Sequence, residues 1–178
     1  ARACDFVKKI RKTPIIVKDS WGFFASRVQN TYILEGIHML SEGYPPALIE
    51  NIGIQSGMPK GALALADDLG LEMVLRFENQ AALIYGPKYI QHPAVPALLK
   101  MIEELDRKGA KKKAGFYEYP EEGKRSLWPA LATHFPMSQE NFTVGALTER
   151  ILFVQVIEAV WCIQENVIKS VSEANLGS

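Results

Sequence analysis

The chain has 178 residues, and its 20 Lys and Arg residues balance its 20 Asp and Glu residues, so the formal net charge is zero. Without an excess of positive charge, no overall field draws the protein to nucleic acid or anionic lipid, and the composition disfavours a polyanion-binding role. Hydrophobic residues make up 48% of the chain. No apolar run approaches the roughly 18 to 20 residues that a membrane span needs, so we expect no span.

Only two cysteines occur, and they lie far apart in the sequence. Cys162 stands in an apolar stretch, where a cysteine is more often a small buried hydrophobe than half of a disulfide. The N-terminal residues do not lead into the apolar core of a signal peptide. A reducing, intracellular compartment is the default expectation.

Helical spacing of apolar residues dominates the chain. Residues 4–12 resemble the end of a helix, and residues 13–18 are β-branched and predict a short strand. A short helix fits residues 127–134, and residues 107–120 predict a basic loop that leads into an extended aromatic piece. Longer helices are predicted at 22–42, 46–57, 61–68, 71–85, 95–109 and 143–167. The pattern therefore favours an all-α fold.

The helix at 143–167 repeats the helix at 22–42. An offset of 123 residues superposes apolar positions, as expected for any two amphipathic helices. It also superposes five Gly and charged positions without a gap, which chance explains less easily. These pairs are Gly22 and Gly145, Arg27 and Arg150, Glu35 and Glu158, Glu42 and Glu165, and Glu50 and Glu173.

We therefore expect two related helical units in tandem, the second truncated. Ser170 and Glu173 have the spacing of a capping box that opens a further helix, so the protein is expected to continue beyond Ser178. The predicted organisation is a connector at 1–19, a first helical unit at 20–120, a linker at 121–142 and a second, incomplete unit at 143–178.

Three motifs in this order resemble the 3-hydroxyacyl-CoA dehydrogenases. Residues 12–28 are similar to the strand and the P-G-F-x-x-N-R turn that open the family's helical C-terminal domain. Residues 57–70 are similar to its P-M-G-P segment, and residues 113–119 to its G-K-G-F-Y-x-Y ending. The resemblance implies a fold like the C-terminal domain of 6-phosphogluconate dehydrogenase. The duplication is similar to that of the multifunctional fatty-acid β-oxidation proteins.

This resemblance implies oxidation of an L-3-hydroxyacyl-CoA to the 3-ketoacyl-CoA, with NAD as cofactor of the parent protein. In the family the catalytic His and Glu and the dinucleotide fingerprint belong to a separate NAD domain. The chain shows no such fingerprint, and the spacing of its three histidines, His38, His92 and His134, suggests neither a dyad nor a metal site. We expect these residues alone to bind no cofactor and no metal, and to be inactive.

The same resemblance assigns candidate site residues. Ser26 stands where the family has an Asn near the substrate carbonyl, and is the candidate catalytic residue; a serine that bonds to its own backbone is the alternative. Arg27 is either a substrate contact or, like Arg150, part of a buried ion pair. The candidate substrate-binding set is Phe23, Ser26, Arg27, Pro59, Lys60 and Gly61.

Two other functions stay open at this stage. The chain could be a non-catalytic helical interaction module on the same scaffold, or the C-terminal domain of another NAD-dependent dehydrogenase. Expected partners are the acyl-CoA substrate together with the NAD domain, and a homodimer or a thiolase-containing complex of the parent. The compartment would be the cytoplasm in a bacterium, and a mitochondrion or peroxisome in a eukaryote.

Overall fold

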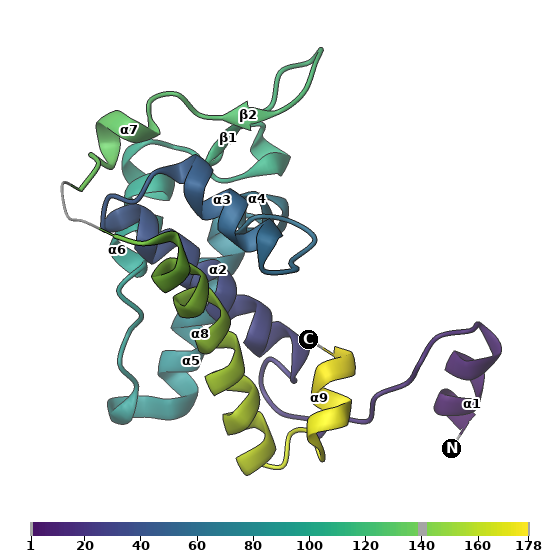
Figure 1. Ribbon diagram of the computed structural model, residues 1–178. Helices are drawn as coiled ribbons and strands as arrows, with labels where there is room; N and C mark the ends of the chain where they lie inside the picture. The colour runs from purple at the N-terminus through teal and green to yellow at the C-terminus, as the bar shows by residue number, and fades with distance from the viewer. Residues whose placement is uncertain (1, 139–141, 178) are drawn as a thin grey trace. The chain divides into compact units, whose positions relative to one another are not determined.

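The computed structural model describes residues 2–138 and 142–177, and they are predominantly helical (Figure 1). One small antiparallel sheet accompanies the helices. The α-helices are α1 (Arg2–Lys9), α2 (Ala25–Ser41), α3 (Pro46–Gln55), α4 (Ala62–Leu69), α5 (Leu71–Tyr85), α6 (Val95–Leu99), α7 (Leu131–His134), α8 (Val144–Gln164) and α9 (Val171–Gly177). The strands are β1 (Tyr117–Glu118) and β2 (Ser126–Leu127). The predicted all-α class is confirmed.

The contacts divide the chain into two compact units, and α2 and α8 contribute residues to both. Unit 1 comprises residues 1–29 and 155–178, and unit 2 comprises residues 30–154. The domain boundaries expected from the sequence stay a prediction, and the expected linker runs through residues 139–141, which lie outside the described residues. No helix in the described part of the chain has the length and apolarity that crossing a membrane requires.

The core of unit 1 forms around the ends of α2 and α8. Phe24, Cys162 and Ile168 are buried together there, and Cys162 is a free thiol, as expected. The segment 13–18 is not a strand, which corrects the sequence prediction. Its β-branched side chains Ile15 and Val17 pack against this core, and the Lys18 N–H donates to the carbonyl of Val167. A strand also needs a neighbouring strand with which to form a ladder, and the bond from Lys18 to Val167, a residue of the loop after α8, does not provide one.

The core of unit 2 is built around one face of α2. Tyr32, Ile33 and Ile37 are fully buried, and they share a cluster with residues of α3, α4, α5 and α6. Gly36 permits a close approach of α4 to α2, because a Cβ added there would lie 2.3 Å from the Cβ of Ala62. A larger residue at position 36 would therefore push α4 away from α2.

The helix predicted at 95–109 ends earlier than expected, and its last turn is π-helical instead of α-helical. After α6, residues 100–104 form a π-helical turn, and the chain then leaves the helix through Asp106 at a positive φ of 49°. The Leu105 N–H donates to the carbonyl of Lys100, five residues back, which widens the last turn. Apolar spacing alone cannot separate this turn from an ordinary α-helical one.

Arginine–glutamate pairs connect α2 with α8 in a reciprocal pattern. In unit 1, Arg27 of α2 donates to Glu158 of α8 and to Glu165, which directly follows α8. In unit 2, Arg150 of α8 donates to Glu35 of α2 and to Glu42, which directly follows α2. The 123-residue offset maps each set of partners onto the other. The interpretation of Arg27 and Arg150 as members of ion pairs is confirmed, and the pattern supports the duplication hypothesis.

Arg27 is the more deeply buried of the two arginines, with 5% of its side chain exposed. Burial alone would lower the pKa of Arg27, but the hydrogen bonds and charges of Glu165 and Glu158 outweigh it and raise that pKa. The guanidinium is therefore fully charged in unit 1. Removal of its charge would leave the Glu158 carboxylate, which is 12% exposed, without its partner.

We predict that Arg27→Met lowers the free energy of unfolding by about 3 to 5 kcal/mol, since it leaves a buried carboxylate unpaired. Lys113→Met is the matched control, because the Lys113–Glu121 pair is exposed and screened by water. This control should change stability by less than about 1 kcal/mol. Urea unfolding followed by circular dichroism measures both values, and equal losses in the two variants would contradict the prediction.

Candidate functional site

The turn before α2 positions three of the predicted site residues. Gly22 and Phe23 adopt positive φ angles of 72° and 49°, which delays the start of α2 to Ala25. The Phe23 ring is 51% exposed, and Ser26 in the first turn of α2 is exposed too. Arg27 is buried in its ion pairs. Unit 1 therefore presents an aromatic ring and a hydroxyl to solvent at this turn.

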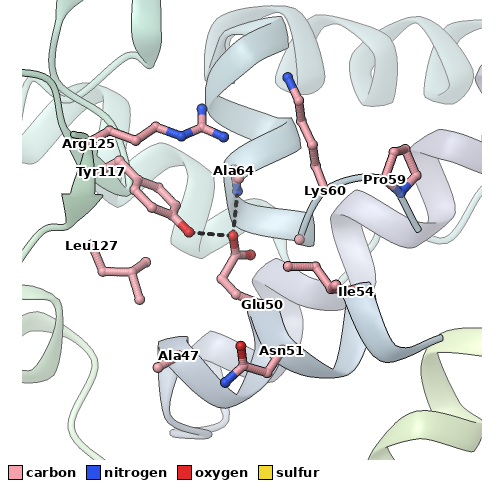
Figure 2. A pocket seen from close by; sticks show the side chains of 11 residues that line it. Ala47, Glu50, Asn51, Ile54, Pro59, Lys60, Ala64, Tyr117, Arg125 and Leu127 are labelled. Atoms are coloured by element: carbon pink, nitrogen blue, oxygen red, sulfur yellow. Dashed lines mark hydrogen bonds between the residues drawn. The ribbon is translucent and has the colours of Figure 1, made fainter. Parts of the chain in front are cut away.

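A pocket of about 400 Å³ opens in unit 2 (Figure 2). Its residues come from α3, from the turn that leads into α4, from the first turn of α4, and from the β1–β2 hairpin. Apolar groups and long polar side chains share its wall. The lining residues are Ala47, Glu50, Asn51, Ile54, Pro59, Lys60, Gly61, Ala64, Tyr117, Arg125 and Leu127.

Glu50 is the central polar group of this pocket. It belongs to α3, but its carboxylate accepts hydrogen bonds from the backbone N–H groups of Leu63, at 2.7 Å, and Ala64, at 3.2 Å, in the first turn of α4. The Tyr117 hydroxyl donates a third hydrogen bond from β1 (Figure 2). Burial raises the pKa of Glu50, while these three donors oppose the rise. The carboxylate thus joins three segments at one point.

A glycine is required next to this carboxylate. A Cβ added at Gly61 would lie between 2.3 and 2.5 Å from the carboxyl carbon and both oxygens of Glu50. Gly53 of α3 faces a similar limit, because its Cβ would lie 2.0 Å from the Tyr32 hydroxyl oxygen. That hydroxyl in turn donates to the carbonyl of Lys60. The turn at residues 60–61 is therefore held by Glu50, which packs against Gly61, and by Tyr32, which donates to Lys60.

The rim of the pocket carries two basic side chains that share one carboxylate. Asp68 accepts from the Lys60 ammonium at 2.5 Å and from the Arg125 guanidinium at 2.9 Å. Burial would raise the pKa of Asp68, but Lys60 and Arg125 outweigh it and lower that pKa. Asp68 therefore stays ionised and holds both cations at the rim.

Asp67 of α4 binds the aromatic residues Phe116, Tyr117 and Tyr119. It is fully buried, and its oxygens accept from the backbone N–H groups of Phe116 and Tyr117 and from the Tyr119 hydroxyl, each at 2.9 Å. A Cβ at Gly115 would lie 2.0 Å from an Asp67 oxygen, so the segment can approach this closely only with glycine there. The hydrogen bond from the Tyr117 N–H to Asp67 thus positions Tyr117 at the pocket.

His38 and His92 lie next to each other, a contact that their spacing in the sequence does not predict. The rings of His38 and His92 lie 5.8 Å apart in an edge-on arrangement. Burial lowers the pKa of His92 to about 4, and the neighbouring His38 and Arg150 add to this effect. Both histidines belong to the Arg150 ion-pair region. Over the described residues, no group of three or more His, Cys, Asp or Glu has the arrangement of a metal site.

The six candidate substrate-binding residues fall into two groups. Pro59, Lys60 and Gly61 line the unit 2 pocket together. The other three, at the turn before α2, belong to unit 1. Their role in substrate binding stays a prediction for all six.

Sequence reasoning missed three residues of the pocket. The sequence singles out Glu50 only as the repeat partner of Glu173, whereas the structure shows its carboxylate bound to the start of α4. Tyr117 was recognised only as part of a motif, and Arg125 fell in the expected linker.

Residues 22–119 match the family model of the 3-hydroxyacyl-CoA dehydrogenase C-terminal domain. The match begins at the glycine of the α2 turn and ends at the tyrosine that donates to Asp67. The chain belongs to this family. The resemblance inferred from the three motifs is thereby confirmed. The residues that match the 3-hydroxyacyl-CoA dehydrogenase C-terminal domain include every pocket-lining residue from Ala47 to Tyr117.

A solved structure shows the same fold over nearly the whole chain. The dehydrogenase part of multifunctional enzyme 1 from C. elegans matches with a TM-score of 0.70 and 22% sequence identity. The match covers 98% of this chain but 41% of the C. elegans chain. The 178 residues therefore span less than half the length of that relative.

We predict that Gly61→Ala destabilises unit 2 by about 1 to 3 kcal/mol, since its methyl group would displace a buried, hydrogen-bonded carboxylate. Gly145→Ala is the control, because a Cβ there meets nothing within 4 Å and α8 gains a better helix former. Thermal unfolding of both variants measures the difference. A Gly61→Ala variant as stable as Gly145→Ala would contradict the role given to Glu50.

Proposed function

We propose that this chain forms the substrate-facing wall of an NAD-dependent L-3-hydroxyacyl-CoA dehydrogenase, whose redox chemistry resides in another domain of a longer protein. The observation that carries the proposal is the pocket behind residues 59–61. Those residues resemble the family's P-M-G-P segment, from which Lys60 and Ala62 depart, and the family match includes them. Family membership and a formed cavity at the same segment support a binding role.

The pocket suits part of an acyl chain. Its volume of about 400 Å³ is within the roughly 300 to 1,000 Å³ of small-molecule sites. Ile54, Pro59 and Leu127 supply apolar wall, and each methylene that leaves water gains about 0.8 kcal/mol. Glu50 accepts three hydrogen bonds, so it shapes the wall and is not available as a general base.

Ser26 would act at the carbonyl end of the substrate. Its position in the first turn of α2 is exposed, and a hydroxyl there can donate to an oxygen on which charge develops. NAD, bound by the other domain, would accept the hydride from the substrate carbon. In this proposal, the 178 residues bind and orient the acyl-CoA and are inactive alone.

The wider assignments follow from the same resemblance. We propose that the parent acts in fatty-acid β-oxidation and assembles as a homodimer or as part of a thiolase-containing complex. The C. elegans relative is described as a multifunctional enzyme, which supports a parent with further domains. The compartment would be the cytoplasm of a bacterium, or a mitochondrion or peroxisome.

We predict that Ala47→Trp in the full-length protein raises KM about tenfold for a long-chain 3-hydroxyacyl-CoA, a loss of about 1.4 kcal/mol of binding. Ala47 is exposed at the pocket wall, so the indole fills the cavity without disturbing the core. NADH formation measures the effect, with 3-hydroxybutyryl-CoA as the short substrate that should be unaffected. Ala132→Trp, exposed on α7 and outside the pocket, is the control. Equal effects on both substrates would refute the acyl-pocket assignment.

We predict that Ser26→Ala lowers kcat of the full-length protein by about 10-fold to 100-fold and leaves KM nearly unchanged, because it removes a hydrogen bond that strengthens in the transition state. Ser41→Ala is the control, since Ser41 is exposed at the opposite end of α2. Steady-state NADH formation measures both variants. An unchanged kcat in Ser26→Ala would assign that serine to its own backbone. No turnover by the wild-type protein would refute the proposed function itself.

A further inference from the structure

Two histidines lie among the ion pairs of Arg150. The Arg150 guanidinium lies 3.0 Å from the Nδ1 of His38, and it also donates to Glu35 and Glu42. His92 lies on the loop before α6, and its Nε2 is 3.9 Å from a carboxylate oxygen of Glu35. These five residues are called the histidine cluster below. All of them belong to unit 2, and they connect the first half of α8 with α2.

The hydrogen bonds of the cluster require both imidazoles to be neutral. A guanidinium can only donate, so the Nδ1 of His38 accepts from Arg150 and carries no proton. The Nδ1 of His92 likewise accepts from the Ala94 N–H, at 3.2 Å. The one proton of each ring is therefore on Nε2, which faces a glutamate in both cases. Neither ring can take a second proton unless an existing hydrogen bond breaks.

Protonation of His38 would weaken the hold of Arg150 on α2. The second proton removes the acceptor that Arg150 uses, and it places a positive charge 3.0 Å from the guanidinium. Glu42, four residues after His38, lies 3.4 Å from its Nε2 and would gain a cationic partner on its own helix end. Of the two carboxylates that bind Arg150, Glu35 alone would then depend on it.

His92 makes the same arrangement sensitive to pH. Burial lowers the pKa of His92 from its ordinary value of 6.5 to about 4, and His38 and Arg150 add to this effect. The closed arrangement therefore binds fewer protons than an open one in which His92 meets water. The stability that His92 contributes is fully present above pH 6.5 and is lost as the pH falls toward 4.

We propose that the histidine cluster is a pH-sensitive switch, which holds the first half of α8, residues 144–154, on α2 at neutral pH and releases it in mildly acidic conditions. Neutral imidazoles accept hydrogen bonds in the closed state, and imidazolium ions repel Arg150 in the open state. Two carboxylates attract the added protons, but they face the Nε2 atoms, which are already protonated. The switch is independent of the proposed function, because it rests on contacts within unit 2.

The second half of α8 provides an internal comparison. The 123-residue offset relates His38 to Trp161, and Arg27 donates to two glutamates there. The sequence has one further histidine, His134, which stacks on Trp128. The Arg27 ion pairs thus have no group that changes its charge near neutral pH in the way a histidine does. They should hold their half of α8 across the range in which the histidine cluster opens.

Hydrogen–deuterium exchange of the full-length protein tests the switch. From His92 alone, the opening equilibrium should rise about tenfold as the pH falls from ~7.5 to ~5.5. We therefore expect the protection factors of residues 144–154, corrected for the intrinsic exchange rate at each pH, to fall by tenfold or more. Those of residues 155–164 should stay nearly constant. Constant protection of residues 144–154, or an equal fall in both halves of α8, would overturn the proposal.

Asparagine substitutions show whether the histidines are responsible. The amide oxygen of Asn can replace the Nδ1 atom as an acceptor but takes no proton in this pH range. The double variant His38→Asn/His92→Asn should therefore protect residues 144–154 equally at both pH values. His134→Asn is the matched control, since it removes a histidine outside the cluster and should respond to pH as the wild type does. A double variant that responds as strongly as this control would overturn the proposal, because other groups would then carry the pH dependence.

Discussion

The structure of unit 2 depends on two buried carboxylates that are satisfied by backbone donors. An unpaired charge in a protein interior costs several kcal/mol, so Glu50 and Asp67 can be buried only where donors converge on them. Each accepts three hydrogen bonds, and each reaches a segment distant in the sequence. Tyr117 contributes to both, through its hydroxyl to Glu50 and its N–H to Asp67. The α3–α4 turn and the β1–β2 hairpin are therefore held together by the hydrogen bonds of these two carboxyl groups, and the pocket lies between them.

This constraint explains which residues may vary around the pocket. Gly61 and Gly115 each approach a buried carboxylate so closely that no side chain fits. Lys60 and Arg125, in contrast, point from the rim and share Asp68, and their long side chains can move without exposing a buried charge. The floor of the pocket is thus rigid, and its rim is adaptable. A rigid floor positions a chain-like ligand, and an adaptable rim can accommodate ligands of different length.

The helices could be predicted because their apolar periodicity is local, whereas the pocket could not. Glu50 and Tyr117 are separated by 67 residues, and no pattern in the sequence predicts the contact between them. The β1–β2 pairing was missed for the same reason, since strands of two residues carry no periodicity. Residues 13–18 show the opposite error: β-branched composition favoured a strand, but a strand needs a partner, and hydrophobic packing of Ile15 and Val17 took its place. Lys60 and its neighbours were found through a motif, without any geometric expectation of a cavity.

The helices α2 and α8, which the 123-residue offset relates, share their charged positions but differ in the burial of their apolar faces. The arginine–glutamate pairs persist in both, at positions related by one offset. The apolar face persists as well, but it is buried on α2 and open on α8. An ion pair constrains only the two helices that form it, so it is complete as soon as α2 and α8 meet. An apolar face gains its stability only when a further segment removes it from water. The ion pairs of α2 and α8 are therefore satisfied within the described residues, while the apolar face of α8 is exposed to solvent.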